Sequence, residues 1–419
     1  MKAWLNDVGI VSALGTTKSA HLEALASASN QPLTQNTGLS HTGCDPFVGK
    51  VAGVDLNTTR RNNQIIDLAL TQLQPTLAAV FARYPKERIA VVMGTSTADI
   101  YDGERARSER ARAERARTER ARSERAQAGK SNNEGDNTQV WPQGYHYHHQ
   151  ALDAPAQYIK ARLGLQGLAY SISTACSSSA KALSSAKGML EAGLADVVIC
   201  GGADSLCQLT VNGFAALAST SEALCRPFAA DRDGINIGEG AAIFVMSKER
   251  SLGHASTALI GCGASSDAYH MSAPEPTGEG AQSAMHQALA DAGIKPQDVD
   301  YLNAHGTATP KNDEMEAQAI ARVLGCDVPV SSTKHWTGHT LGAAGAIEAA
   351  ICWLLIEQQR LAVDLPLLLP KQGSYPLDDS LQNINIIQKE IIKKPKICMS
   401  NSFAFGGNNA CLILGEVDA

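Results

Sequence analysis

The sequence predicts an α/β protein. Short apolar runs that end at glycine, such as residues 88–94 and 195–202, are typical of buried strands. Longer segments with helical patterns lie between such runs, and the segment 177–193 is rich in small residues that allow a helix to pack closely on all sides. Strand and helix therefore alternate along the chain, which is the pattern of α/β folds.

The second half of the chain repeats this pattern. We expect an amphipathic helix at 281–292, a strand at 299–304 and a long apolar helix at 342–358. The repetition predicts two similar halves that share one core.

The composition is that of a globular chain. With 419 residues, 44% of them hydrophobic, the chain can bury a large core. A net charge of -6 gives no overall attraction to nucleic acid or to an anionic membrane. The apolar stretches 349–356 and 361–369 are too short to span a bilayer, and the N-terminus lacks the apolar run of a signal peptide. We expect a cytoplasmic protein that neither binds nucleic acid nor inserts into a membrane.

The ten cysteines are scattered, without CxxC pairs. This spacing argues against a disulfide framework and against a zinc site, and it fits a reducing compartment. Most of the cysteines lie in apolar runs, where a thiol behaves as a small buried hydrophobe.

One segment, 104–138, departs from the pattern. Residues 104–127 repeat a five-residue unit that begins Glu-Arg-Ala-Arg, with nine arginines and five glutamates. Because five residues do not match a 3.6-residue turn, the charges wind around every side of a helix and leave no apolar stripe. We expect a solvated surface insertion, partly helical or disordered, with a basic docking strip for an acidic partner as the alternative. The repeat has no aromatic residues for stacking, which disfavours nucleic-acid binding.

Three histidines, His146, His148 and His149, follow the insertion. Clustered histidines can bind zinc, but no carboxylate or cysteine stands at usable spacing. We expect a polar, aromatic interface loop here and no metal centre.

Cys176 lies between a strand-like run and the start of the small-residue helix, in the sequence Thr-Ala-Cys-Ser-Ser-Ser. A helix N-terminus carries partial positive charge and free N–H groups, which lower the pKa of a thiol and favour its thiolate. Cys176 is therefore a candidate nucleophile.

Two histidine motifs follow in the second half. His305 stands at the end of the strand 299–304, where active sites of α/β folds collect, and Thr307 and Thr309 come just after it. His339 lies in a segment that also contains Lys334 and leads into a glycine-rich helix start.

A fourth motif is the glycine-rich segment 401–409, which contains Phe403 and Phe405. We expect it to be a loop with exposed backbone amides, bracketed by a final pair of strands at 397–399 and 410–414.

Together, the four motifs in this order resemble the β-ketoacyl-acyl-carrier-protein synthases, condensing enzymes of the thiolase-like superfamily. Further matches are residues 225–228, 231–234 and 238–240, and Asp313 with Glu316 after the first histidine motif. The likeness runs from residues 8–15 to the last strand, and only the insertion stands outside it.

The resemblance implies a thiolase-like fold with a duplicated αβαβα layered core. It places an N-terminal half at 1–250 with Cys176, and a C-terminal half at 255–419 with His305 and His339.

The resemblance also implies a reaction. Cys176 would accept the acyl chain from the phosphopantetheine arm of an acyl carrier protein. His305 and His339 would hold the carbonyl of malonyl-carrier protein while carbon dioxide leaves, and the resulting enolate would attack the Cys176 thioester. Two neutral imidazoles can donate hydrogen bonds to such a developing oxyanion. No tightly bound cofactor and no metal are expected.

Supporting roles follow from the same resemblance. Lys334 would pair with Glu316 and set the environment of the histidines. The backbone amides of Cys176 and Phe405 would form the oxyanion hole, and the Phe405 ring would gate the pocket.

Thr307, Thr309 and Phe403 would bind the pantetheine arm, and Asp313 would support the site with Glu316.

Departures from the family pattern indicate a subtype. Ala404 and Asn408 replace the usual glycine and threonine, so the mobility of the gate would differ. Residues 212–214, 234–242 and the Tyr147-x-x-Gln150 element look more like the ketosynthases of aryl polyene pigment clusters. The partner would be a second copy of the chain or a homologue that resembles a chain-length factor.

Two other classes compete with this interpretation. A catalytically weak or silent chain-length subunit would lack the nucleophile, whereas this chain has Cys176. A degradative thiolase uses a second cysteine in a C-terminal loop, whereas Cys411 falls on the expected last strand.

Overall fold

Ten strands form one mixed sheet in this computed structural model. The structure describes residues 2–417 except 28–31, 37, 41–44, 55–59, 129–140, 253–254, 362–364, 367 and 382. In sheet order the strands are β11 (Val330–Ser331), β10 (Tyr301–Asn303), β12 (Ile397–Ala404), β13 (Asn408–Glu416), β9 (Thr257–Ser266), β1 (Ala3–Val11), β8 (Gly240–Ser247), β6 (Val197–Asp204), β4 (Ile89–Gly94) and β5 (Ala169–Ile172). A small second sheet contains β2 (Thr34–Gln35), β3 (Phe47–Gly49) and β7 (Ile237–Gly238).

The large sheet is internally duplicated. In the order β5-β4-β6-β8-β1, the first two pairings are parallel and the next two antiparallel. The order β11-β10-β12-β13-β9 repeats this sequence of pairings, and β1 joins β9 at the centre. The strands of each set also follow one another in the same order along the chain. The predicted duplication is therefore present in the topology, while the division at residues 250–255 into separate units stays a prediction.

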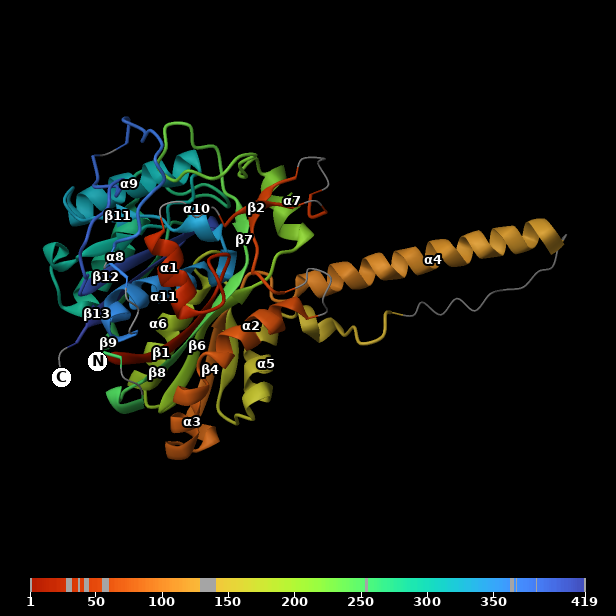
Figure 1. The fold of residues 1–419 in the computed structure, drawn as a ribbon, viewed down its shortest axis with the longest axis horizontal. Helices are drawn as coiled ribbons and strands as arrows, with labels where there is room; N and C mark the ends of the chain where they lie inside the picture. Colours follow the sequence, from red (N-terminus) through yellow and green to blue (C-terminus); the bar gives the residue numbers. More distant parts are fainter. Residues whose placement is uncertain are drawn as a thin grey trace.

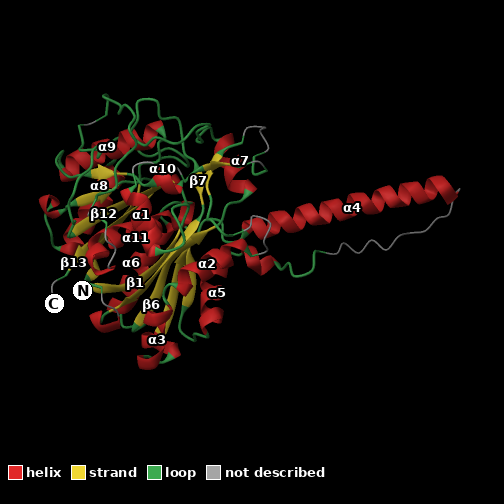
Figure 2. Ribbon diagram, in the orientation of Figure 1, coloured by secondary structure: helices red, strands yellow, loops and turns green. Residues whose placement is uncertain are grey.

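Helices cover the sheet, as Figures 1 and 2 show. They are α1 (Lys18–Ala26), α2 (Arg61–Thr71), α3 (Gln74–Arg83), α4 (Ile100–Ala128), α5 (Ala154–Leu163), α6 (Ser178–Glu191), α7 (Gln208–Ala216), α8 (Glu279–Ala292), α9 (Pro310–Leu324), α10 (Lys334–Thr337) and α11 (Ala344–Glu357). Among them, α2 and α8 contact different halves of the sheet: α2 packs on β1 and β8, and α8 on β9 and β13.

The helices α6 and α11 form the central layer. Each contacts strands of both halves, and they also contact each other. Small residues permit this approach: a Cβ on Gly345 of α11 would lie 2.8 Å from the Cβ of Ala180 in α6. The same holds where α6 crosses β4, because a Cβ on Gly94 would lie 2.2 Å from the backbone nitrogen of Ser179. The predicted close packing of the helix at 177–193 is thus observed.

One helical run, Leu341–Leu361, is long and apolar enough to cross a membrane, but its apolar window is entirely buried inside the body. The bent pair α2 and α3 passes the same test only when the two helices are joined across a 76° bend. Packing against β12, β13 and α6 accounts for the apolar composition of α11.

The end of the chain differs from the prediction. The segment 401–409 is not a long loop, because β12 extends to Ala404 and β13 begins at Asn408, with seven residue pairs in register before the turn closes at Ala404 and Asn408. Only Phe405–Gly407 turn the chain, with Gly406 and Gly407 at positive φ. Ser400–Ala404 continue the strand because each of them pairs with a residue of β13, and all of them are buried.

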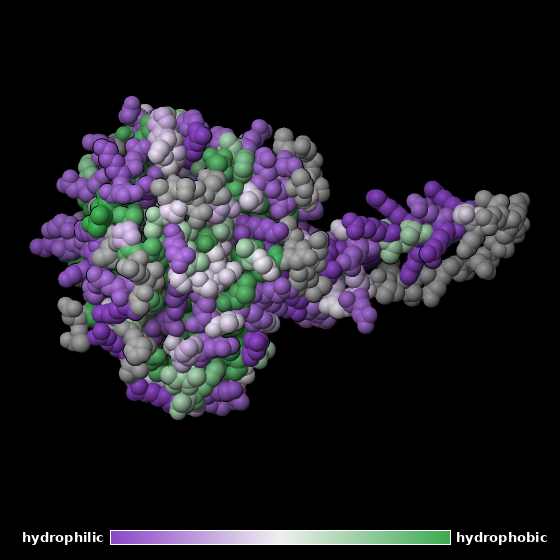
Figure 3. Space-filling model, in the orientation of Figure 1, coloured by the Kyte–Doolittle hydropathy of each residue, from purple (hydrophilic) through white to green (hydrophobic). Residues whose placement is uncertain are grey.

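The arginine repeat forms most of α4, which projects from the body (Figure 1). Residues 111–120 are exposed, as expected of a helix without an apolar stripe, and Figure 3 shows a mostly hydrophilic surface along it. Arginine, alanine and glutamate favour helix, and pairs such as Arg105–Glu109 and Arg110–Glu114 add support along the axis. Residues 129–138 of the predicted insertion lie outside the described residues.

Candidate active site

Cys176 occupies a strained turn between β5 and α6. Ala175, just before it, has a φ of 53°, a left-handed conformation that residues with a Cβ seldom adopt. Hydrogen bonds hold the turn: the Thr174 amide donates to the Ser178 hydroxyl at 2.9 Å, and the Ser96 hydroxyl donates to the Ala175 carbonyl at 3.1 Å. Strain of this kind persists only where surrounding contacts enforce it, and it concentrates at functional sites.

The two predicted histidines meet at this thiol. His339 Nε2 lies 3.0 Å from Cys176 Sγ, and the rings of His305 and His339 are 5.4 Å apart and nearly perpendicular. His305 follows β10, whereas His339 lies between α10 and α11, at the place in the second half that Cys176 occupies in the first. All three side chains are buried. The duplicated topology thus brings together residues far apart in the sequence.

The charge state of the cysteine differs from the prediction. Burial raises the pKa of the Cys176 thiol to about 11, although the charge of Lys334 and the backbone N–H of Phe405 lower it. The helix start was predicted to lower the pKa of Cys176. That prediction is wrong for the net shift, because desolvation raises the pKa by more than the helix start lowers it. Burial, and then the charge of Lys334, hold the pKa of both His305 and His339 well below the usual range. The resting site therefore pairs a thiol with neutral imidazoles.

Lys334 does not pair with Glu316, which corrects a second prediction. Its ammonium forms an ion pair with Glu348 in α11, and both side chains are almost completely buried. Glu316 in α9 instead accepts the backbone N–H groups of His305 and Gly306 at 2.8 and 2.7 Å. Those two donors and the Asn401 amide at 3.3 Å occupy the carboxylate that Lys334 was expected to reach.

Two further acidic groups hold the turns around the site. Asp313 accepts the backbone N–H groups of Phe228 at 2.7 Å and Ala308 at 3.2 Å, and so supports the turn after His305. Asp204, at the end of β6, accepts the backbone N–H groups of Ser96 at 2.9 Å and Gly342 at 2.7 Å. It thereby links the Cys176 side of the site to the segment after His339.

Sequence reasoning missed both Glu348 and Asp204. The sequence contained a signal for each of them. Glu348 is the only charged residue between Ala344 and Ile356, and Asp204 follows an apolar run that ends in glycine.

The turn after β12 closes the site from another side. The backbone N–H groups of Phe405 and of Cys176 itself both point to Cys176 Sγ, the arrangement of an oxyanion hole. The Phe405 ring lies 5.5 Å from that of Phe214 in α7, and Phe403 lies edge-on to His305 at 6.2 Å. The predicted oxyanion donors are therefore adjacent to the predicted nucleophile, and the roles of all three groups stay predictions.

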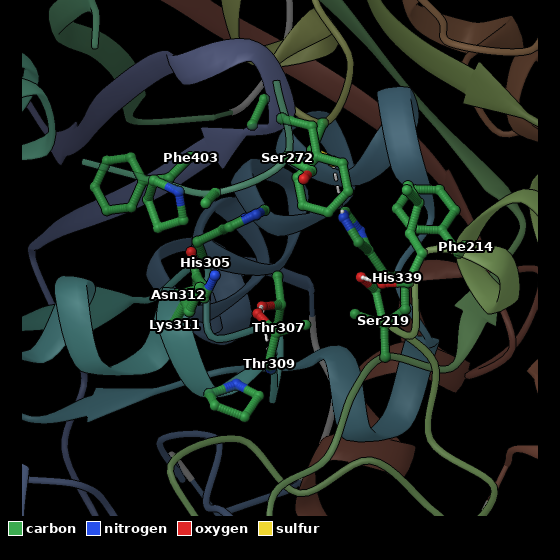
Figure 4. A pocket seen from close by; sticks show the side chains of 18 of the residues that line it. Phe214, Ser219, Ser272, His305, Thr307, Thr309, Lys311, Asn312, His339 and Phe403 are labelled. Atoms are coloured by element: carbon green, nitrogen blue, oxygen red, sulfur yellow. Dashed lines mark hydrogen bonds between the residues drawn. The ribbon is translucent and has the colours of Figure 1, made fainter. Parts of the chain in front are cut away.

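A pocket of about 310 Å³ is lined by Cys176, His305 and His339, and Figure 4 shows the two histidines in it. His305 and His339 reach it from separate segments, with Thr307 and Thr309 on its wall. The hydroxyls of these threonines are 2.9 Å apart. Phe403 and Phe405 line the same pocket, so the residues expected to contact the pantetheine arm and the acyl chain share one cavity.

The atoms of Cys176, His305 and His339 that could bind a metal lie within 4.8 Å of one another, and within the described ranges no other group of this kind is found. The histidines that follow the insertion do not form such a group: His149 contacts Asp102 at 3.1 Å, and the rings of His146 and His148 stack at 4.8 Å.

Comparisons with known proteins agree with this geometry. Residues 81–251 match the family model "Beta-ketoacyl synthase, N-terminal domain", and residues 256–367 match "Beta-ketoacyl synthase, C-terminal domain". Nodulation protein E of Rhizobium meliloti is 37% identical over 275 residues, which cover 63% of this chain and 66% of the relative. The 3-oxoacyl-[acyl-carrier-protein] synthase 2 of Staphylococcus aureus strain COL is 36% identical over 281 residues, which cover 64% and 66%. These alignments thus span just under two thirds of each relative.

Among solved structures, a chain of the complex of the ketosynthase ApeO with its chain length factor ApeC, from Xenorhabdus doucetiae, superposes with a TM-score of 0.84 at 37% identity, covering 99% of this chain and 98% of that one. A chain of the AntDE:AntF complex of an acyl-carrier protein with its ketosynthase superposes with a TM-score of 0.80 at 24% identity, covering 100% and 99%, which shows the shared fold. By fold, motif order and full-length similarity, the chain belongs to the beta-ketoacyl synthase family.

Proposed function

We propose that this protein is a β-ketoacyl-acyl-carrier-protein synthase, which joins a malonyl unit to an acyl group held on Cys176. The observation that carries the proposal is the setting of Cys176 Sγ, which has His339 Nε2 at 3.0 Å and the N–H groups of Cys176 and Phe405 around it. A nucleophile, a proton acceptor and two oxyanion donors thus converge on one pocket.

The first half-reaction loads the acyl group. Cys176 Sγ attacks the thioester carbonyl of an acyl chain on the phosphopantetheine arm of a carrier protein. Because the resting thiol is protonated, its proton moves to His339 Nε2 during the attack and then to the departing pantetheine sulfur. The N–H groups of Cys176 and Phe405 stabilise the tetrahedral oxyanion.

The second half-reaction forms the carbon–carbon bond. The thioester carbonyl of malonyl-carrier protein lies between His305 and His339, whose neutral rings each donate a hydrogen bond. For His339 this requires the tautomer with the proton on Nε2, the opposite of the one that accepts the thiol proton during loading. The carbon–carboxylate bond breaks, carbon dioxide leaves, and the electron pair forms an enolate. The enolate carbon attacks the acyl carbonyl on Cys176, the thiolate departs, and uptake of one proton restores the thiol.

Burial, and in addition the charge of Lys334, lowers the pKa of both histidines. These two effects hold the rings in the neutral form that can donate to an enolate oxygen. We propose Thr307 and Thr309 as partners of the pantetheine arm, because both line the pocket beside the reactive groups.

We further propose a partner that resembles a chain-length factor, and an acyl chain of the aryl polyene type. The first rests on the similarity to a ketosynthase that was solved with its chain length factor. In the described part of the chain, β5 ends the large sheet and pairs only with β4, so its free edge is available to a second subunit. The aryl polyene assignment rests on the sequence elements at 212–214 and 234–242. We place the protein in the cytoplasm, where its nine described cysteines, all free, stay reduced.

The test separates loading from decarboxylation. Cys176→Ala should take up no acyl group from a purified acyl-carrier protein, measured by intact-protein mass spectrometry. Cys326→Ala, at an exposed cysteine, should load as the parent does and is the matched control. Condensation by Cys176→Ala at the parental rate would overturn the proposal.

His305→Ala and His339→Ala should keep part of the loading but lose carbon dioxide release from malonyl-carrier protein. His148→Ala, at an exposed histidine, is the control. A parent protein that neither loads nor releases carbon dioxide would favour the silent chain-length subunit instead.

A further inference from the structure

The arginine repeat of α4 is the conspicuous feature that the proposed chemistry does not use. Residues 104–127 carry nine arginines and five glutamates, a local charge of +4. The whole chain has a net charge of -6, so the remainder carries -10. An acidic partner is thus repelled by the body and attracted by the arm.

The charge is accessible. Arg105 and Arg110 pair with Glu109 and Glu114, and Arg110 also lies over the Trp141 ring at 4.7 Å. By contrast, the second arginine of four successive repeat units is exposed and makes no ion pair with a described residue. These four are Arg107, Arg112, Arg117 and Arg122.

The root of the arm contacts α7, a helix that lines the pocket. The Glu104 carboxylate accepts the backbone N–H groups of Gln208 and Leu209 at 2.8 and 2.6 Å, in the first turn of α7. Phe214, further along α7, lines the pocket. At about 1.5 Å per helical residue, this contact is only ~8 Å along α7 from Phe214, while α4 itself extends ~43 Å. The arm therefore begins close to the wall of the pocket, and its length is several times that separation.

The spacing of the arginines determines how the arm can act. Successive repeat units are turned by about 140° on a helix, so Arg107, Arg112, Arg117 and Arg122 point in different directions. Such a rod offers no single face for a rigid interface. It does produce a positive field around its whole length, and a field of this kind raises the rate of association more than it slows dissociation.

We propose that α4 is an electrostatic capture arm for the acyl carrier protein, acting on a carrier whose docking face is acidic. This inference rests on the proposed function, because it assumes that a carrier delivers the substrate. Capture increases the local concentration of carrier at the pocket without contributing a residue to the chemistry.

The experiment measures association of a purified acidic acyl carrier protein in its phosphopantetheinylated, fluorescently labelled form. The test variant, Arg107→Gln/Arg112→Gln/Arg117→Gln/Arg122→Gln, removes four charges and makes the repeat neutral, and glutamine is nearly as good a helix former as arginine. The matched control replaces the same four residues by lysine and keeps the charge. Circular dichroism of both variants checks that the helix persists.

In stopped-flow measurements at low salt, the glutamine variant should associate on the order of 10-fold more slowly than the parent, with a dissociation rate changed less than about 2-fold. The lysine variant should match the parent. The difference should vanish near 1 M salt, where the Debye length is about 3 Å.

Equal association rates of the glutamine and lysine variants at low salt would overturn the proposal. So would tighter binding of the parent to a DNA duplex than to the carrier, because the arm would then serve another class of partner. Acylation of the parent by a small pantetheine thioester tests the proposed function separately. Failure of that acylation, with normal carrier association, would reject the enzyme assignment and not the arm.

Discussion

Lys334 and Glu348 form an ion pair that is almost completely buried between α10 and α11, directly behind the two histidines. Burial raises the pKa of Glu348 to about 7, and the neighbouring ammonium opposes this shift. The pair provides a fixed positive charge near the reaction, because the charge of Lys334 lowers the pKa of Cys176, His305 and His339.

Removing one partner of this pair should destabilise the fold. In Glu348→Gln, Lys334 would remain buried without a counter-ion, so the free energy of unfolding should fall by roughly 3–5 kcal/mol. Chemical denaturation monitored by tryptophan fluorescence measures it. The double variant Lys334→Met/Glu348→Leu, which removes both charges, should recover most of the loss. A single variant as stable as the double one would contradict the role of the pair.

The same double variant should shift the pH profile of malonyl decarboxylation. Without Lys334, the pKa of both histidines rises toward its usual value, although burial still holds it down. Activity requires neutral rings and is lost as the pH falls through these pKa values. The acidic limb of the rate profile should therefore move to higher pH. Lys187→Met is the control, because Lys187 pairs with Glu191 and Asp291 away from the site. An acidic limb at the same pH in parent and double variant would count against electrostatic tuning.

Cys176 should react slowly with alkylating reagents at neutral pH. A pKa of about 11 leaves roughly one thiol in ten thousand ionised at pH 7, so labelling by iodoacetamide should rise about tenfold per pH unit and continue to rise beyond pH 9. Mass spectrometry follows the reaction in a Cys326→Ser background, which removes the exposed thiol among the described cysteines. A rate that levels off below pH 8 would show that the thiolate is stabilised, as the helix start alone predicts.

The turn that carries Phe405 is tethered to the helix that begins after Cys176. Lys181 Nζ in α6 donates to Asn408 Oδ1 at 2.9 Å, one turn and a half after the nucleophile. Asn408→Ala should loosen the Phe405 N–H and lower kcat by more than about 3-fold, but by less than the 10²–10³-fold that loss of one oxyanion donor costs. The KM for malonyl-carrier protein should change little.

Asn408→Asp keeps an acceptor for Lys181 and should retain the parental kcat, which distinguishes the tether from a general packing effect. If the alanine and aspartate variants have equal kcat values, the tether does not position Phe405.

The sequence by itself determined the class of fold, the order of the motifs and the candidates for the reactive residues. These properties depend on short-range patterns: apolar runs, helical periodicity and a few residues at strand ends, such as Cys176 and His305. The solvated character of the arginine repeat also followed, because a five-residue period cannot produce an apolar stripe.

Only the tertiary structure decided which distant groups meet. Lys334 is 14 residues from Glu348 and 18 from Glu316, and both carboxylates are buried, so the sequence could not choose between them. The partner of Lys334 depends on how α9 and α11 pack. In the folded chain, the backbone N–H groups of His305 and Gly306 already donate to Glu316. The pKa of Cys176 was decided in the same way. The helix start is visible in the sequence, but the opposing desolvation arises only when two halves of the chain close over the thiol.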